Sequence, residues 1–292
     1  MTVLELPATR IATDGTRHHG RVWAPASARA GVVVVHGLTD HGGRYDGPGR
    51  ALAEHGIAVL AMDLRGHGRS AGPRGHTPSF DRLIHDVIDS REELRGRIGP
   101  VPVFVLGHSM GGLITIRCVE EFPRVFDGAI VISPWLGTTM RVPRWKLALA
   151  GVLSRLVPAL PIPARIDAAA LSHDAAVVRA YREDPLVHDR ITPRLFTEAQ
   201  AAMRLCWQHA ERIQLPVLFL IAGDDRIVDA GLVLEFAESL PSDRTTVRVY
   251  DGGFHELLNE PDAERIRDDL REWLEARITG AVAAGGAENR AG

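Results

Sequence analysis

The sequence contains very little cysteine for its length. Cys118 and Cys206 are the only two cysteines among 292 residues. Two thiols so far apart do not form a disulfide framework, and each lies in an apolar segment of helical character, so we expect both to be buried structural residues. A chain of this length buries enough apolar surface to fold without a disulfide or a structural metal.

The chain also lacks an excess of either charge and any long apolar run. Lys and Arg total 34 against 37 Asp and Glu, a formal net charge of −3. Because nucleic-acid-binding proteins usually carry a strong basic excess, a nucleic-acid partner is not expected. No stretch approaches the roughly 18 consecutive apolar residues of a membrane span. The first residues lack the basic and apolar regions of a secretory signal, so we expect a cytoplasmic protein.

Short runs rich in β-branched residues are the strongest structural signal. They occupy residues 31–35, 57–62, 103–106, 129–132, 217–221 and 246–250. Most are apolar at every position, which is typical of strands covered on both faces. Because helix-length stretches separate them, the pattern predicts an α/β fold with a mostly parallel central sheet flanked by helices. Residues 3–6 and 16–23 predict an antiparallel edge hairpin.

The connection after the fourth predicted strand is far longer than a crossover requires. The surplus lies between about residues 135 and 194. We therefore expect residues 1–134 and 195–278 to form the α/β core, with residues 135–194 inserted as a helical cap. The Gly- and Ala-rich residues 279–292 predict a disordered tail.

One predicted strand leads directly into a Gly-x-Ser-x-Gly turn. Residues 107–111 follow the third apolar run and precede a helical stretch, which is the strand–turn–helix setting of a nucleophile elbow. The two glycines permit a turn sharp enough to expose the Ser109 hydroxyl. A serine hydroxyl is a weak nucleophile, so it needs a base that an acid orients. Chains with this elbow place the acid and then the histidine after the serine.

Two later turns carry the candidate acid and base. His255 follows the last predicted strand, and no other histidine beyond the elbow follows a strand. Asp224, Asp225 and Asp229 all follow the fifth predicted strand. Loops at the carboxyl ends of parallel strands meet at one edge of the sheet, so all four residues are candidates. The residues alone leave the choice among the three carboxylates open.

Leu38 and Met110 are the candidate oxyanion donors. Stabilisation of the oxyanion requires two backbone N–H groups aimed at the developing charge. Met110 directly follows the nucleophile, and Leu38 lies in the His-Gly-Leu turn after the first apolar strand. His36 begins that turn, and its position ahead of the elbow favours a role in structuring the loop over a role as the base.

Several motifs resemble those of the monoacylglycerol lipases and related lysophospholipases, a branch of the α/β-hydrolases. They are HGLTDHGGRY at 36–45, DLRGHGRS at 63–70, GHSMGG at 107–112, ISP at 132–134 and YREDPL at 181–186. The likeness runs from about residue 16 to residue 277. Asp225 with the Arg-Ile-Val that follows resembles the family pattern at the acid and favours Asp225. Ala222 departs from that pattern, because many relatives place a glycine there.

The resemblance implies an α/β-hydrolase fold and hydrolysis of a lipid ester, most directly a monoacylglycerol or a lysophospholipid, through an acyl-enzyme. Ser109 would attack the carbonyl, His255 would carry the proton and Asp225 would hold the imidazolium. A short-chain carboxylesterase, an aminopeptidase of the same superfamily and a non-catalytic binding protein stay open as alternatives. No metal-ligand spacing such as His-Glu-x-x-His occurs, so neither a metal nor another cofactor is expected.

Trp135, Leu149 and Leu153 are candidate substrate contacts in the cap. Leu149 and Leu153 belong to an apolar face with helical spacing that also includes Trp145 and Leu156. This face either packs on the sheet domain or acts as a lid that touches a lipid surface while nearby basic residues meet head groups. The sequence leaves both possibilities open.

Overall fold

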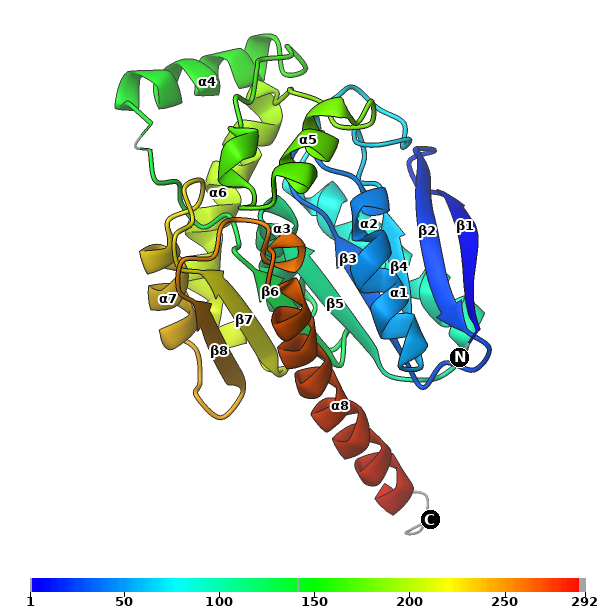
Figure 1. Ribbon diagram of the computed structural model, residues 1–292. Coiled ribbons are helices and arrows are strands. Elements are labelled where there is room, and N and C mark those ends of the chain that lie inside the picture. Colours follow the sequence, from blue (N-terminus) through cyan, green and yellow to red (C-terminus); the bar gives the residue numbers. More distant parts are fainter. Residues whose placement is uncertain (1, 141, 289–292) are drawn as a thin grey trace.

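The computed structural model describes residues 2–140 and 142–288 and is built on an eight-stranded sheet (Figure 1). The strands are β1 (Val3–Ile11), β2 (Arg17–Pro25), β3 (Ala30–Val35), β4 (Ile57–Met62), β5 (Val103–His108), β6 (Gly128–Ile132), β7 (Val217–Ala222) and β8 (Thr245–Tyr250). Their spatial order is β1-β2-β4-β3-β5-β6-β7-β8. β1 and β2 pair antiparallel, as do β2 and β4, and the other pairs are parallel. The predicted mostly parallel sheet is confirmed, and the edge hairpin is longer than expected.

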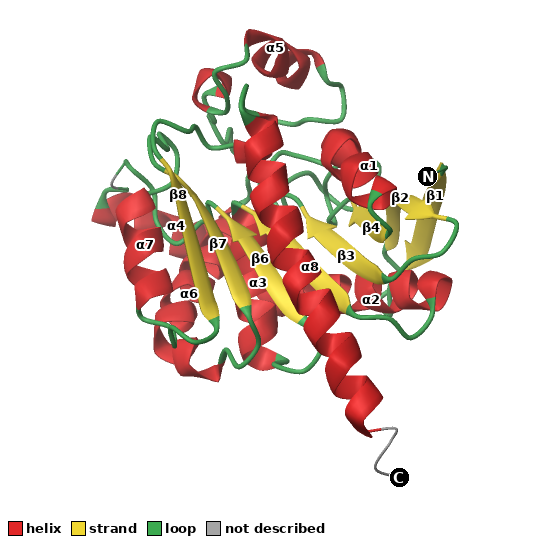
Figure 2. Cartoon of the chain, turned by 60° about the horizontal axis from the view of Figure 1, so that its bottom comes forward, coloured by secondary structure: helices red, strands yellow, loops and turns green. Residues whose placement is uncertain are grey.

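Helices cover both faces of the sheet, which is why its central strands are apolar throughout (Figure 2). The helices α1 (Asp46–Glu54) and α8 (Ala263–Glu288) lie on one face, and α2 (Phe80–Ile98), α3 (Met110–Glu121), α6 (Pro193–His209) and α7 (Ala230–Glu238) lie on the other. Successive strand residues point to opposite faces. Within β3, for example, Val33 packs in the core with α2 and α3, while Val32 packs in the core with α1 and α8.

The cap elements lie between β6 and α6. They are α4 (Arg144–Leu156), the short 3₁₀ helix η2 (Ala168–Ala170) and α5 (Ala175–Glu183), and another 3₁₀ helix, η3 (Ala210–Arg212), follows α6. In Figure 1, α4 and α5 both lie at the top of the view. α4 is attached to α6, where the Ser154 and Thr197 hydroxyls are 2.9 Å apart. The domain boundaries stay a prediction, and the second of them falls in the first turn of α6.

α4 packs against α6, but most of its apolar face is exposed. The side chains of Trp145 and Leu149 are 64% and 48% exposed, and Val152 and Leu156 are also exposed. Within α4 only Ser154 is buried. The helix thus packs on the sheet domain through α6, while most of its predicted apolar face is left uncovered. Contact of this face with a lipid surface stays a prediction.

Helix α8 continues to Glu288, so the disorder predicted from residue 279 is wrong up to that residue. Ile266 and Leu270 anchor the start of this helix in the core. Adding residues to a helix that has already formed costs little, and alanine, which is frequent in the tail, has the highest helix propensity. Residues 289–292 lie outside the described part of the chain. None of the described helices, α8 included, is long and apolar enough to cross a membrane.

Candidate active site

Ser109 lies in a strained turn between β5 and α3. Its backbone adopts φ 55° and ψ −118°, a left-handed conformation that a non-glycine residue adopts only under constraint. The flanking glycines make the turn possible, because a Cβ on Gly111 would collide with the Val35 carbonyl and one on Gly107 would collide with the Gly111 carbonyl. The elbow predicted from the sequence therefore forms at the carboxyl end of β5, where its serine is partly exposed.

His255 and Asp225 form a buried hydrogen-bonded pair in the loops after β8 and β7. The His255 Nδ1 atom is 2.7 Å from Asp225 Oδ2, and the two side chains are only 4% and 1% exposed. The other carboxylate oxygen of Asp225 accepts the backbone N–H groups of Ile227 and Val228, each at 2.9 Å. A carboxylate at this position fixes the Nδ1–H tautomer of the imidazole, which leaves Nε2 free to act as a base.

The surroundings of Asp225 keep it ionised. Burial alone raises the pKa of this carboxyl, but the charge and hydrogen bond of His255 together with the two backbone donors lower the pKa below its ordinary value. The other two candidate carboxylates lie elsewhere. Asp224 is exposed and pairs with Arg226, and Asp229 accepts the Leu232 N–H as the N-cap of α7. The structure thus brings Asp225 to His255, and brings neither Asp224 nor Asp229.

The two candidate oxyanion donors lie on either side of the elbow. Met110 is the first residue of α3, where the helix dipole favours negative charge. Leu38 follows Gly37, whose Cα lies so close to the nucleophile that an added Cβ would be 3.2 Å from Ser109 Cβ. Within the described residues, neither the Leu38 N–H nor the Met110 N–H has an acceptor in the protein. Both donors are therefore available to a substrate oxygen.

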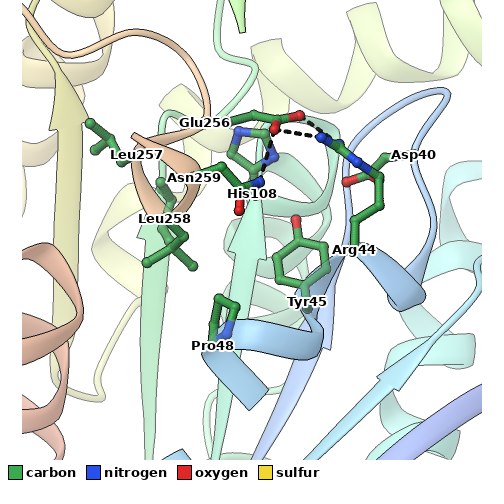
Figure 3. Close-up of a pocket in the computed structure, with 10 residues that line it drawn as sticks. Asp40, Arg44, Tyr45, Pro48, His108, Glu256, Leu257, Leu258 and Asn259 are labelled. Atoms are coloured by element: carbon green, nitrogen blue, oxygen red, sulfur yellow. Dashed lines mark hydrogen bonds and ion pairs between the residues drawn. The ribbon is translucent and has the colours of Figure 1, made fainter. Parts of the chain in front are cut away.

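An ionic cluster that the sequence did not predict adjoins the site (Figure 3). Arg44 donates to both carboxylate oxygens of Glu256, at 2.6 and 2.7 Å, and to Asp40 at 3.2 Å. Arg44 belongs to η1 (Gly42–Tyr45), and Glu256 stands between His255 and η4 (Leu257–Asn259). The only signals in the sequence were an Arg-Tyr pair in a family motif and a glutamate beside the candidate base.

The cap segment at 171–174 is fastened to the loop that carries His255. The Glu256 N–H donates to the Leu171 carbonyl at 2.8 Å, and the Ser172 hydroxyl donates to the Asn259 carbonyl at 2.8 Å. His173 is 2.7 Å from a Glu260 carboxylate oxygen through its Nδ1. These contacts place this part of the cap beside the histidine loop.

The YREDPL motif of the cap is explained by contacts with residues 36–45, the segment that carries Leu38 and that we name the oxyanion loop. The Tyr181 hydroxyl lies 2.5 Å from the Thr39 hydroxyl, and Asp184 lies 2.9 Å from His41 Nε2. Both loop residues belong to the segment that carries Leu38. The motif therefore attaches the cap to the loop that supplies a candidate oxyanion donor.

A cysteine thiol or a bound metal ion would provide a reactive centre different from Ser109. Cys118 and Cys206 are both free and fully buried, as the sequence predicted. Burial raises the pKa of the Cys118 thiol to about 12, so this thiol is no nucleophile at neutral pH. Across residues 2–140 and 142–288 no group of three or more histidine, cysteine or acidic side chains is placed to hold a metal ion.

Burial keeps several histidines near the site neutral. Desolvation lowers the pKa of His108 and of His188 to about 4, and it also lowers the pKa values of His36 and His67. His108 directly precedes the nucleophile, and its Nε2 lies 3.1 Å from the His255 carbonyl oxygen. These histidines link the stability of the fold to pH.

We expect the folded state to lose stability as the pH falls from about 6.5 to about 4. Histidines of the unfolded chain bind protons near pH 6.5, whereas His108 binds one only near pH 4 in the folded state, so acid favours unfolding across this window. His108→Gln keeps a donor to the His255 carbonyl. It should reduce the slope of the free energy of unfolding against pH by up to about 1.4 kcal/mol per pH unit. Urea unfolding across the window measures it, and equal slopes in both proteins would contradict the prediction.

Comparisons with known proteins agree with this geometry. The family described as serine aminopeptidase, S33, matches residues 26–262. A monoacylglycerol lipase from Mycolicibacterium smegmatis is 31% identical over 266 residues, which cover 88% of this chain and 92% of that protein. An uncharacterized abhydrolase domain-containing protein from Dictyostelium discoideum is 33% identical over 266 residues, and the chain spans only 28% of its length.

A solved structure is similar over nearly the whole chain. The crystal structure of the Paleococcus ferrophilus monoacylglycerol lipase superposes with a TM-score of 0.81 at 33% identity, covering 95% of this chain and all of that one. The family resemblance drawn from the motifs is thereby confirmed. The chain belongs to the serine aminopeptidase S33 family of α/β-hydrolases, in the branch that contains the monoacylglycerol lipases.

Proposed function

We propose that this protein hydrolyses monoacylglycerols to a fatty acid and glycerol through an acyl-enzyme on Ser109. The observation that carries the proposal is the buried 2.7 Å hydrogen bond between His255 and Asp225, in loops at the same sheet edge as the strained serine elbow. Similar proteins named as monoacylglycerol lipases support a glyceride as the substrate.

The residues account for both half-reactions. Ser109 Oγ attacks the ester carbonyl while its proton passes to His255 Nε2, and the Leu38 and Met110 N–H groups stabilise the oxyanion. Collapse of the intermediate breaks the ester bond, and the imidazolium protonates the departing glycerol oxygen. His255 then takes a proton from water as the water oxygen attacks the acyl carbonyl. The imidazolium returns a proton to Ser109 Oγ as the fatty acid leaves. Asp225 stabilises the imidazolium in each half.

Two other enzyme activities and one binding function would fit the same fold. A short-chain carboxylesterase or an aminopeptidase would use the same triad, so initial rates on 1-monooleoylglycerol, p-nitrophenyl acetate and a proline anilide separate them. We expect kcat/KM to be highest for the monoacylglycerol and to rise with acyl-chain length, since each buried methylene contributes about 0.8 kcal/mol. A flat chain-length profile or faster anilide cleavage would contradict this. A non-catalytic binding protein would hydrolyse none of the three.

The exposed face of α4 suits contact with a lipid surface. Trp145, Leu149, Val152 and Leu156 form this face, which we name the cap surface. Arg144, Lys146 and Arg155 on the same helix are also exposed. Apolar side chains flanked by cations fit an interface that has acyl chains below and anionic head groups above. This contact would deliver a lipid ester to the cap.

Three cap residues are proposed to contact the acyl chain on its way to the elbow. Trp135 is buried, and its backbone N–H donates to the Ser109 carbonyl at 2.9 Å, so it lies directly beside the nucleophile. Leu153 is partly buried and Leu149 is exposed on α4. Together they offer apolar contacts both at the nucleophile and at the outer helix.

We predict that Trp145→Ser combined with Leu156→Ser weakens binding to lipid vesicles by at least about tenfold, because each side chain contributes about 1.5–3 kcal/mol when it leaves water. Sedimentation with vesicles of mixed phosphatidylcholine and phosphatidylglycerol measures the bound fraction. Val249→Ser is the matched control, because Val249 is 43% exposed but lies on β8. Unchanged vesicle binding in the double variant would show that the cap surface is not the membrane contact.

A further inference from the structure

Three segments around the candidate triad converge on the Arg44 side chain. Its guanidinium holds Glu256 through two parallel hydrogen bonds and Asp40 through a third (Figure 3). The Arg44 side chain is 11% exposed and the Glu256 side chain 6%. The ring of Tyr181 lies against the same guanidinium, with its centroid 4.8 Å from Cζ. Arg44 is therefore enclosed by protein on several sides.

Each partner of Arg44 belongs to a different functional segment. Asp40 lies two residues after the candidate oxyanion donor Leu38. Glu256 directly follows the candidate base, and its own N–H is held by the cap. Tyr181 belongs to α5 of the cap. The contacts of this one side chain thus fix the relative positions of the oxyanion loop, the histidine loop and the cap.

The charges of this cluster make its geometry specific. Burial by itself lowers the pKa of the Arg44 guanidinium. The carboxylates of Asp40 and Glu256 have the larger effect and raise this pKa, so Arg44 stays protonated. Paired carboxylates and one planar guanidinium, removed from water, interact far more strongly than they would at a surface. Loss of either carboxylate would leave part of the buried Arg44 charge without its partner, which is unfavourable.

Little water reaches the cluster. A cavity of about 20 Å³ lies beside it, lined by Tyr45, His108 and Asn259 among others, which is room for about one water molecule. The Asn259 side chain donates to Glu256 Oε2 at 2.9 Å and so limits the movement of this carboxylate. The low exposure of both side chains therefore shields the ion pair from most of the solvent.

We propose that Glu256 and Arg44 are positioning residues that hold His255 and the Leu38 N–H at a fixed position relative to each other. Neither touches a reacting atom. Asp225 orients the His255 ring through Nδ1, and His108 contacts the His255 carbonyl, while the Glu256–Arg44 pair ties the same backbone to the oxyanion loop. The inference rests on the triad proposed above. It assigns to these two residues the alignment of base and oxyanion donor that the chemistry requires.

The test is Glu256→Gln, which keeps the size of the side chain and removes its charge. On p-nitrophenyl butyrate we expect kcat to fall by about 10- to 100-fold with KM nearly unchanged, since a displacement on the order of 1 Å costs about 10² in rate. Glu256→Asp restores the charge and should recover part of the loss. Glu275→Gln is the matched control, because it removes a two-pronged pair with Arg29 at the amino end of β3, and its kcat should equal that of the wild type.

A spectroscopic readout separates positioning from stability. The far-downfield proton resonance of the His255–Asp225 hydrogen bond should shift or broaden in Glu256→Gln and stay unchanged in Glu275→Gln. If Glu256→Gln does not fold, Arg44→Lys replaces it, because lysine keeps the charge but cannot hold the carboxylate through two bonds. A folded variant with wild-type kcat and an unshifted resonance would overturn the inference.

Failure of the positioning role and failure of the proposed monoacylglycerol hydrolysis give different results in these experiments. The same loss of kcat on p-nitrophenyl butyrate in an enzyme that hydrolyses no monoacylglycerol would support the positioning role and remove the proposed substrate. Equal fluorophosphonate labelling rates at Ser109 in the wild type and in Glu256→Gln would overturn the positioning role and leave the triad in place.

Discussion

Ser109→Ala is expected to lower kcat for ester hydrolysis by about 10⁶, the largest effect of any single substitution in this protein. The alanine cannot form the acyl-enzyme, so the residual rate should exceed the rate in water by no more than about 10³–10⁴, from the oxyanion donors and binding alone. Steady-state rates on p-nitrophenyl butyrate measure the loss. The fold should persist, because alanine removes one partly exposed hydroxyl.

Ser133→Ala is the matched control for this prediction. Ser133 also follows a parallel strand, β6, and also has a positive φ, of 40°. Its hydroxyl accepts the Ala222 N–H within the core and is not flanked by two free donors. We expect its rate to stay close to that of the wild type, and a loss as large as that of Ser109→Ala would challenge the choice of nucleophile.

Asp225→Asn should lower kcat by about 10⁴, the second largest effect. The amide can present its NH₂ group to His255 Nδ1, which favours the tautomer with the proton on Nε2, where the base must accept one. It also removes the charge that stabilises the imidazolium. The pair is almost completely buried, so water cannot substitute for the carboxylate. Rates on p-nitrophenyl butyrate across pH measure the effect.

Asp224→Asn is the neighbouring control. Its carboxylate is 54% exposed and contacts Arg226 rather than His255. An exposed pair of this kind contributes little, so we expect a rate near that of the wild type. If Asp224→Asn were the slower variant, the acid role would pass to Asp224.

Much of the fold follows from local sequence pattern. The apolar runs predicted as strands correspond to β3 through β8 to within about two residues at each end, because runs rich in β-branched residues favour the strand conformation. The tail was predicted less well. Its glycines suggested disorder, whereas a helix already anchored at Ile266 extends through them to Glu288.

The candidate site was likewise predictable from the sequence only in part. Ser109, His255 and the three competing carboxylates follow strands, so strand order alone brought them to one edge of the sheet. The contact between Arg44 and Glu256 joins positions 212 residues apart, and no local pattern encodes such a pairing. The exposure of α4 was likewise beyond reach, because an apolar helical face has the same spacing whether or not a partner covers it. The cytoplasmic location and the absence of a nucleic-acid partner stay predictions.

Fluorophosphonate labelling with mass-spectrometric mapping identifies the nucleophile of this protein. We expect a single adduct on the peptide that carries Ser109, formed more slowly when 1-monooleoylglycerol competes for the site. We also expect Asp225→Asn to react much more slowly than the wild type, because the same base activates the serine. An adduct on another residue, or a labelling rate that 1-monooleoylglycerol does not change, would contradict the assignment of Ser109 as the nucleophile of a monoacylglycerol hydrolase.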